Sequence, residues 1–509
     1  MIKLAIFPIL KSFSAEEIKS FSAFVESPYH NKSKKLILLL REIKKFHAHS
    51  DLENLNKEKL LKKISSELKY NDSTFRSLMF DLVRLAEKFM ILEKLFDNEW
   101  EKNVYLLKSL TERKNRSLFE KNLQKANLEL EENGVDSVYF YNKSILEMSK
   151  FNYNIINSSE KSPDNIEKNV SNVTQYVVNL AIFFITEAIN SYLHLTVHEY
   201  KYKLPDKKNY LLKIIQQINI GELYKHIKKS SDHAYIIELY LSLMDSYAEM
   251  ENPEKFLKYK SLVLKYSKLL SSDELSYHFS MLISYCIYKN SITRYRAYMD
   301  EELFKIYNIY LKGKYFLDRK TQYLDESLYR NILVLSLRLK KYKWTLSFIE
   351  EYSGFLHPDK QENLMNLSYA DYYYHTGSNT NSKEFLEIAF NYLKNIREES
   401  FIFKHDIKIL YLMLYYDLDY ADENMVTQLN NYRKFLRRNK LVSENRKKRL
   451  YKFLNLFEKL VFLKNGDHNV YISELYIDIL KSDGLNHHQW LLNKVQQFGS
   501  DNSVKLKYG

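Results

Sequence analysis

Glycine and proline are both scarce in this chain of 509 residues, which contains nine glycines and six prolines. Together they make up about 3% of the chain, against roughly 12% in an average protein. Sandwiches, propellers and barrels depend on these residues for positive φ angles and preset bends, so such folds are disfavoured. No two glycines lie within six residues of each other. The dinucleotide-binding fingerprint and the phosphate-binding P-loop are therefore both excluded.

Cysteine is rarer still, because Cys286 is the only one. A single thiol excludes an intramolecular disulfide framework and a thiolate cluster around zinc or iron–sulfur. The surrounding sequence, 284–288, is an apolar helical context. It predicts a small buried side chain and not a nucleophile.

Long apolar runs are also missing. The most apolar stretch, 176–185, is interrupted by Asn179 and closed by Thr186 and Glu187. A helix that spans a bilayer needs about 20 apolar residues, so this stretch predicts a buried helix of a soluble protein. The N-terminal segment before Pro8 is too short for a signal peptide. We therefore expect a cytoplasmic protein.

Apolar and aromatic residues are plentiful, at 45% and 15% of the chain, with 43 Tyr and 29 Phe. This is enough for a core and argues against disorder. The joint abundance of Lys, Asn, Tyr, Phe and Ile is typical of an AT-rich bacterial genome. The net charge is +13, with local excesses of +5 in 1–50, +7 in 251–350 and +5 in 401–450. Such an excess favours a nucleic acid or an acidic partner, unless it merely solubilises the surface.

Helical periodicity predicts three regions. Residues 1–97 form a compact helical domain, which contains a helix from a capping box at Ser14 to Ser27 and a helix over 34–46. Two further helices are expected over 57–68 and from a cap at Asp72 or Ser73 to about 96. Residues 98–230 form a connecting region with long helices from 100 to about 132 and over 136–157, 166–200 and 208–230. Residues 231–509 form helical repeats with a C-terminal cap.

The repeat is visible as short polar breaks near 251–253, 289–291, 340–341, 376–382 and 417–423. Their spacing of about 40 residues, with two helices per unit, is typical of an α-solenoid. The clearest unit ends at Pro358. It contains a first helix with Leu328, Ile332, Leu335 and Leu339, a turn at Lys340-Lys341, and a second helix with Tyr342, Thr345, Leu346 and Ile349.

This unit resembles the second half of a tetratricopeptide repeat, and 230–480 resembles a degenerate array of them. Lys341 and Thr345 depart from the pattern, standing where a small residue and an alanine are usual. The resemblance implies an all-α, right-handed solenoid of antiparallel helix pairs after the N-terminal helical domain. The string from Phe21 to Lys32, with Tyr70-Asn71-Asp72 and the helix after it, resembles a family of uncharacterised helical bacterial proteins. That second resemblance implies no activity.

No pattern points to catalysis, to a cofactor or to a metal. His194 and His198 share a helix face and have Glu199 beside them, but no third zinc ligand is identifiable. The acidic pairs read as solvated helix faces. We therefore predict no catalytic, cofactor-binding or metal site, and not an enzyme.

A basic stretch over 433–449 has a single acid, Glu444, among nine cations. The cations are Arg433, Lys434, Arg437, Arg438, Lys440, Arg446, Lys447, Lys448 and Arg449. They flank one inter-helix turn and form a candidate site for phosphates or an anionic partner.

The segment 57–90 is a candidate helix-turn-helix, with Arg76, Arg84 and Lys88 available to DNA. Asp72, Asp81 and Glu87 share the second helix, and such acids repel phosphate.

Two hypotheses follow. The first is a non-enzymatic helical-repeat scaffold that binds a protein or peptide partner. The alternative is a basic helical protein that binds nucleic acid or a ribonucleoprotein through 433–449.

Overall fold

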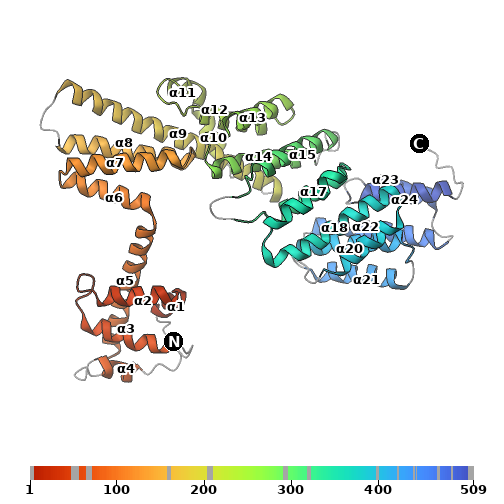
Figure 1. Cartoon of the computed structure of the whole chain (residues 1–509), viewed down its shortest axis with the longest axis horizontal. Helices are drawn as coiled ribbons and strands as arrows, with labels where there is room; N and C mark the ends of the chain where they lie inside the picture. The colour runs from red at the N-terminus through yellow and green to blue at the C-terminus, as the bar shows by residue number, and fades with distance from the viewer. Residues whose placement is uncertain are drawn as a thin grey trace. The chain divides into compact units, whose positions relative to one another are not determined.

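The chain is built from α-helices (Figure 1). The computed structural model describes residues 5–47, 57–64, 71–157, 162–202, 210–290, 296–317, 322–396, 401–420, 423–439, 442, 444–466, 471–482, 485 and 487–501. Within these ranges the regular structure consists of 24 α-helices and a 3-10 helix, without a β-strand. The prediction of an all-α fold is confirmed. Contacts between Cα atoms divide the chain into two compact units, 1–256 and 257–509, and the predicted domain boundaries after 97 and 230 stay predictions.

The first unit opens with α1 (Ile6–Ser12), α2 (Ala15–Glu26), α3 (Lys34–His47), α4 (Lys57–Ile64) and α5 (Asp72–Asp97). The predicted capping box is confirmed. The Ser14 side chain accepts a hydrogen bond from the Glu17 N–H at 3.1 Å, and the Glu17 carboxylate accepts one from the Ser14 N–H at 2.6 Å. Because Ser27 precedes a proline, α2 ends just before it, as predicted.

The predicted cap of α5 is wrong by a residue. Asn71, and not Asp72 or Ser73, is the capping residue, and its Oδ1 accepts a hydrogen bond from the Ser73 N–H at 2.9 Å. Asp72 instead pairs with Arg76 one turn further on. Asparagine, aspartate and serine cap helices about equally well, so three candidates in a row could not be separated by residue type.

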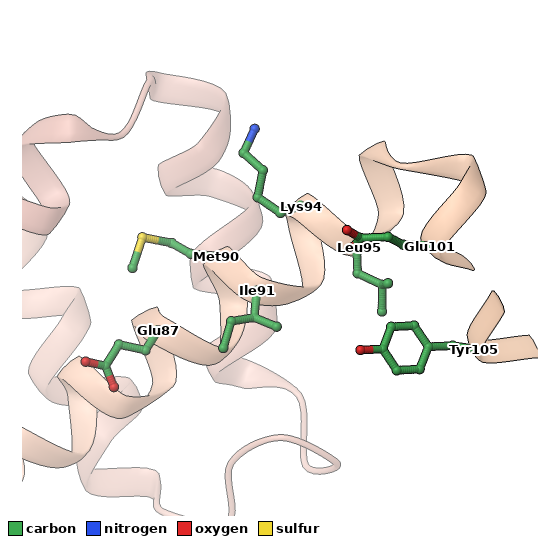
Figure 2. Close-up of a pocket in the computed structure, with 7 residues that line it drawn as sticks. All are labelled: Glu87, Met90, Ile91, Lys94, Leu95, Glu101 and Tyr105. Atoms are coloured by element: carbon green, nitrogen blue, oxygen red, sulfur yellow. The ribbon is translucent and has the colours of Figure 1, made fainter. Parts of the chain in front are cut away.

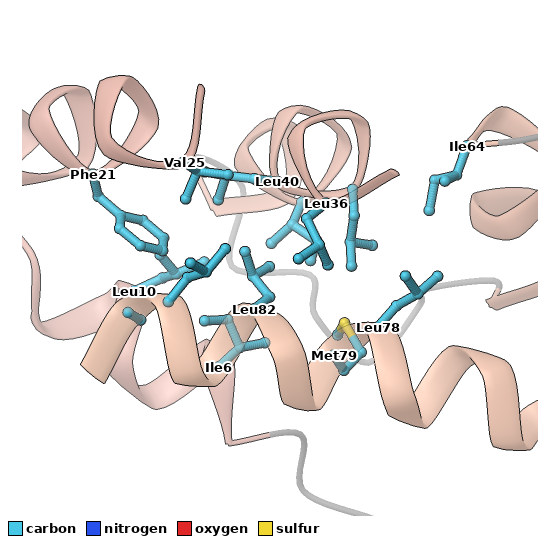
Figure 3. Packing of buried hydrophobic residues seen from close by; sticks show 14 of the residues in the cluster. Ile6, Leu10, Phe21, Val25, Leu36, Leu40, Ile64, Leu78, Met79 and Leu82 are labelled. Carbon is cyan, nitrogen blue, oxygen red and sulfur yellow. The ribbon is translucent and has the colours of Figure 1, made fainter. Parts of the chain in front are cut away.

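Helices α1 to α5 share one apolar core (Figure 3). Phe21 is fully buried, and its ring centroid lies 5.8 Å from that of Phe13 and 5.4 Å from that of Phe89. Leu82 of α5 belongs to the same core and is also fully buried. Each such side chain contributes roughly 1.5–3 kcal/mol by leaving water.

The turn between α2 and α3 carries the motif Ser27 to Lys32. Asn31 is buried in it. Its amide donates hydrogen bonds to the carbonyls of Val25 at 2.9 Å and Ser33 at 3.1 Å, and its Oδ1 accepts one from the Ser33 N–H at 2.8 Å. These contacts give the motif a structural role, since they fix the direction in which the chain leaves α2.

The next helices are α6 (Glu99–Glu112), α7 (Arg116–Glu132), α8 (Ser137–Asn157), α9 (Pro163–Tyr202), α10 (Tyr210–Gln217) and α11 (Ile220–Ile227). The predicted helix over 208–230 is therefore wrong, because the region holds two helices, and 100–132 is likewise interrupted. Each break starts a new helix at an asparagine. Asn115 accepts a hydrogen bond from the Leu118 N–H, and Asn219 accepts one from the Glu222 N–H, both at 3.2 Å. Asparagine is a strong N-cap residue, so each of these asparagines favours the start of a new helix where the preceding helix has ended.

Helix α9 is, in the described part of the chain, the one helix long and apolar enough to cross a membrane, over Pro163–Thr196. Only 33% of its most apolar 18-residue window is buried. The predicted buried helix at 176–185 is thus buried on one face alone. Ile182 and Ile185 are covered, whereas Val177 and Phe184 are 54% and 48% exposed.

The remaining helices are α12 (Tyr235–Ala248), α13 (Pro253–Tyr266), α14 (Ser272–Asn290), α15 (Arg296–Lys312), α16 (Glu326–Arg338), α17 (Tyr342–Tyr352), α18 (Pro358–Thr380), α19 (Lys383–Lys394), α20 (Phe401–Asp417), α21 (Glu423–Arg438), α22 (Glu444–Lys464), α23 (Ile472–Leu480) and α24 (His488–Asp501). The break predicted near 376–382 is present but shorter, because α18 continues to Thr380 and α19 begins at Lys383. Gly377 is buried inside α18, and a Cβ there would lie 3.0 Å from Phe385 Cβ. This glycine lets α18 and α19 approach closely. The helix ends at Asn381, whose φ is 54°.

The unit predicted over 328–358 consists of α16, a short turn and α17. Lys340 takes a φ of 55° in the turn. Thr345, at the position where alanine is usual, is fully buried, and its hydroxyl donates a hydrogen bond to Ser336 Oγ at 2.8 Å. The polar atom of Thr345 thus has a partner across the helix pair, which explains why it is tolerated there.

Candidate functional site

The basic stretch 433–449 lies on the last turns of α21 and the first turns of α22. Three of its cations have partners or little exposure. Arg433 donates to both carboxylate oxygens of Glu458 at 2.8 Å and to Asn455 Oδ1 at 3.0 Å. Lys447 pairs with Glu444 at 2.9 Å, and Arg446 is half-buried.

The other cations divide into an exposed set and one outside the described residues. Lys440 lies outside them. The exposed set consists of Lys434, Arg437, Arg438, Lys448 and Arg449. We call these five side chains the basic patch. The positions of these charges could be predicted from the sequence, but the pairing of Glu458 with Arg433 could not.

The candidate helix-turn-helix falls on α4 and α5, with residues 65–70 outside the described part. The exposed side of α5 carries Arg76, which pairs with Asp72 at 2.5 Å, and Arg84, which lies 5.8 Å from the Phe80 ring centroid. Lys88 is exposed on the same helix. DNA reading by this pair stays a prediction.

The histidine pair on α9 is described in part. His194 is exposed, and the side chain of His198 lies outside the described residues. Among described side chains, no group of three or more His, Cys, Asp or Glu is placed to hold a metal ion.

Cys286 is fully buried. Burial raises the pKa of its thiol far above its ordinary value, and the nearby Glu302 carboxylate raises it further. A thiol held protonated in this way is a poor nucleophile.

An open hollow of about 770 Å³ lies between α5 and α6 (Figure 2). Met90, Ile91 and Leu95 of α5 form its apolar floor, and Tyr105 reaches toward them from α6. Glu87, Lys94 and Glu101 stand at its rim. The lining of the hollow is therefore mainly apolar.

A second group of charges lies in the unit 257–509, on alternate helices. We call it the charged row: Arg330 of α16, Asp371 of α18, Asp406 of α20 and Arg446 of α22, separated by 41, 35 and 40 residues. Helix α16 contacts α18, and α18 contacts α20. Residues at about one repeat spacing thus come together on neighbouring helices.

Arg330 and Asp406 form a two-pronged ion pair across the row. Arg330 Nε and Nη2 donate to the two carboxylate oxygens of Asp406 at 2.7 and 2.8 Å. The two side chains are 27% and 17% exposed, so water reaches both. Two parallel charge-assisted hydrogen bonds fix their geometry.

Asp371 lies beside this pair and is half-exposed. Burial raises the pKa of its carboxyl to about 7, the Asp406 carboxylate raises it further, and Arg330 opposes the rise. Among the described residues, its carboxylate has neither a hydrogen bond nor an ion pair.

His405 adjoins the row and is 1% exposed. Its Nδ1 and the Tyr432 hydroxyl are hydrogen-bonded at 3.0 Å. Burial lowers the pKa of His405 to about 4, and the Arg446 charge lowers it further, against the opposing effect of Asp406. His405 is therefore neutral at pH 7, and the charges of Arg446, Asp406 and Lys408 act on it from nearby.

Sequence reasoning missed the charged row. The only available signal was the recurrence of charged residues at about the repeat period on alternate helices. No protein-family model, curated protein or solved structure matches the chain. The candidate site therefore rests on the geometry of its own residues.

Proposed function

We propose that the chain is a non-enzymatic scaffold whose second unit is a right-handed solenoid of antiparallel helix pairs, similar to tetratricopeptide repeats, and binds a protein or peptide partner. Two kinds of helix contact support the solenoid. Each helix from α14 to α24 contacts the next one in the chain, and α16, α18 and α20 also contact each other in sequence, as do α22 and α24. Stacking of each pair on the next is the arrangement that makes a repeat array stable.

The observation that carries the proposal is the carboxylate of Asp371, which lies beside the Arg330–Asp406 pair and has no hydrogen bond within the part of the chain that the structure describes. In the solenoid that we propose, the first helices of the pairs line the inner face, and the charged row lies along it. At pH above about 7, the charges of Asp371 and Asp406 balance those of Arg330 and Arg446 over the whole row, but the carboxylate of Asp371 is the member without a hydrogen-bonded cation among the described residues. The row then suits a lysine or arginine side chain of an extended peptide. The proposal places this scaffold in the cytoplasm.

Selection from a random peptide library on the full-length protein tests the idea. Enriched peptides are expected to contain a lysine or arginine. Asp371→Asn is expected to weaken their binding about 10–100-fold, since a hydrogen bond to a charged group contributes roughly 1.5–3 kcal/mol. Asp359→Asn is the matched control, because Asp359 lies on the same helix and its side chain is 81% exposed. Equal losses in the two variants, or no enrichment of basic peptides, would refute the proposal.

The basic patch supports one alternative, the binding of nucleic acid or a ribonucleoprotein. Its five exposed cations flank the turn between α21 and α22. Phosphate contacts predict that log K falls linearly with log salt. Reversing Arg437, Arg438 and Lys448 to glutamate is then expected to remove most of that dependence. An absence of single- or double-stranded nucleic acid binding at low salt would eliminate this alternative.

A further inference from the structure

Helix α9 is apolar on two opposite faces. One face packs against α8 and α12, and its Ile182, Ile189 and Leu193 are each 0% exposed. The opposite face is in contact with solvent, with Ile166 54%, Val170 61%, Val177 54%, Phe184 48% and Leu195 40% exposed. A helix that is apolar all round is normally buried on all sides, whereas the described residues of 1–256 leave the second face of α9 uncovered.

The exposed face has a heptad spacing. Val170, Val177 and Phe184 recur every seven residues, and Ile166, Val173 and Leu180 recur every seven residues four positions earlier. Val173 and Leu180 are half-exposed and lie between the more exposed members of this row. We call the apolar row from Ile166 to Leu195 the stripe of α9. Apolar residues at these two heptad positions form the seam by which one helix packs on another of the same period.

The stripe continues onto α8, which runs beside α9 (Figure 1). Four apolar side chains of α8 are exposed: Val138 54%, Tyr141 46%, Ile155 57% and Ile156 50%. The Tyr141 ring lies 5.3 Å from that of Phe183, and Asn154 donates to Asn169 Oδ1 at 3.0 Å. These two contacts show that α8 and α9 are antiparallel, and that Tyr141 of the exposed set on α8 packs against α9.

The size of this surface matches a dimer interface. From Ile166 to Leu195 the stripe on α9 is about 44 Å long at 1.5 Å per residue, and the stripe on α8 is about 27 Å long. With a width of about 10 Å for each helix, the surface covers about 700 Å² per copy. A standard interface buries about 800 Å² per partner, and the largest apolar patch of a monomer is usually about 300–600 Å².

The absence of charge and the heptad period of the exposed α9 face indicate which partner packs on it. Residues 169–186 contain no charged side chain, so a charged partner surface has nothing to pair with there. A helix that lies on a bilayer presents a strongly charged face to water, but the other face of α9 is packed against α8 and α12. A surface with the same period and the same lack of charge is present on every other copy of this chain.

We propose that the exposed faces of α9 and α8 form a dimerisation surface on which α9 of a second copy of this chain packs around a two-fold axis. A two-fold interface uses the same patch on both subunits, and the stripe is complementary to itself. The proposal does not depend on the charged row or on what the second unit binds.

Sedimentation equilibrium of the full-length protein tests the inference. We expect a mass twice the chain mass of 61.2 kDa at micromolar concentration. Val177→Glu and, separately, Val170→Glu are each expected to weaken dimerisation about 100-fold, because each buries an unpaired charge at the seam. Ile477→Glu is the control, since Ile477 is a similarly exposed apolar residue, 46% exposed, on α23. Circular dichroism shows whether each variant stays helical.

Three results would overturn the proposal. One is a monomeric mass for the unmodified chain at all concentrations. Another is a dimer that Ile477→Glu weakens as much as Val177→Glu and Val170→Glu do. The third is co-flotation of the unmodified protein with phosphatidylcholine vesicles that Val177→Glu abolishes, which would assign the face to a lipid surface.

Discussion

The interior of the N-terminal helices α1 to α5 and the charged row of the second unit are organised by different forces. In the first region the buried side chains from Ile6 to Phe89 are apolar, apart from Asn31 in a turn. In the second, two arginines and two aspartates lie on alternate helices beside a buried neutral histidine. Apolar packing has little directional preference and mainly supplies stability. Charges held between helices need fixed partners, so they contribute specificity and a sensitivity to pH.

The largest expected effect lies in the apolar region. Phe21→Ala is expected to lower the free energy of unfolding of α1 to α5 by about 3–5 kcal/mol, because it removes a fully buried ring. Amide hydrogen exchange in the full-length chain measures this. Phe80→Ala is the control, because Phe80 is 61% exposed and its loss is expected to matter little. Similar exchange rates in the two variants would contradict the assignment of Phe21 to the core.

The second effect breaks the ion pair of the charged row. Arg330→Met is expected to cost about 2–4 kcal/mol, somewhat less than the loss of one partner of a fully buried pair, since both groups retain some exposure. Urea denaturation measures it. The double variant Arg330→Met/Asp406→Leu is expected to recover much of the loss, because neither charge is then left alone. A double variant less stable than the single one would show that the pair stabilises the fold outright.

The third prediction concerns the pH dependence of stability, to which Asp371 and His405 contribute with opposite signs. The pKa of Asp371 is about 7 in the folded protein against an ordinary 3.8, so stability is lost as the pH rises between these values. The pKa of His405 is about 4 against 6.5, so stability is lost as the pH falls between those values. Each contributes at most about 1.4 kcal/mol per pH unit.

Asp371→Asn and His405→Gln should therefore change the stability profile in opposite ways. Relative to the unmodified protein, Asp371→Asn gains stability as the pH rises from about 4 to 7. His405→Gln gains it as the pH falls from about 6.5 to 4. Thermal unfolding across this range measures both, and parallel profiles for the two variants would contradict these protonation states.

The smallest effects belong to the basic stretch. Arg433→Ala is expected to cost about 1 kcal/mol through its pair with Glu458, which is 28% exposed. Arg438→Ala is expected to stay within about 0.5 kcal/mol, because Arg438 is an exposed member of the basic patch. Chemical denaturation compares the stability of the two variants. A larger loss for Arg438→Ala than for Arg433→Ala would contradict the assignment of Arg433 as the paired cation and Arg438 as the exposed one.

Local structure could be read from the sequence wherever neighbouring residues decide it. The capping box at Ser14 and the stop before Pro28 depend on residues within one turn, and both predictions are confirmed. The helix restarts at Asn115 and Asn219 were missed, although each is also a local capping signal. Helical periodicity continues through both positions, so the sequence predicted uninterrupted helices and the asparagines were not recognised as helix starts.

The candidate site could not be read in this way, because its contacts are distant in the chain. Arg330 and Asp406 are 76 residues apart, and no local pattern relates them. The exposed face of α9 was missed for another reason. Both of its faces are apolar, so the periodicity that normally separates core from surface was absent.

The most direct test of the central claim, that the charged row receives a cationic group, is the affinity of a selected lysine-containing peptide at about pH 6 and about pH 8. Because the Asp371 carboxyl loses its proton near pH 7, binding is expected to be about tenfold tighter at the higher pH. The Asp371→Asn variant is expected to bind weakly and equally at both. An unmodified protein whose affinity is the same at the two pH values would contradict the account.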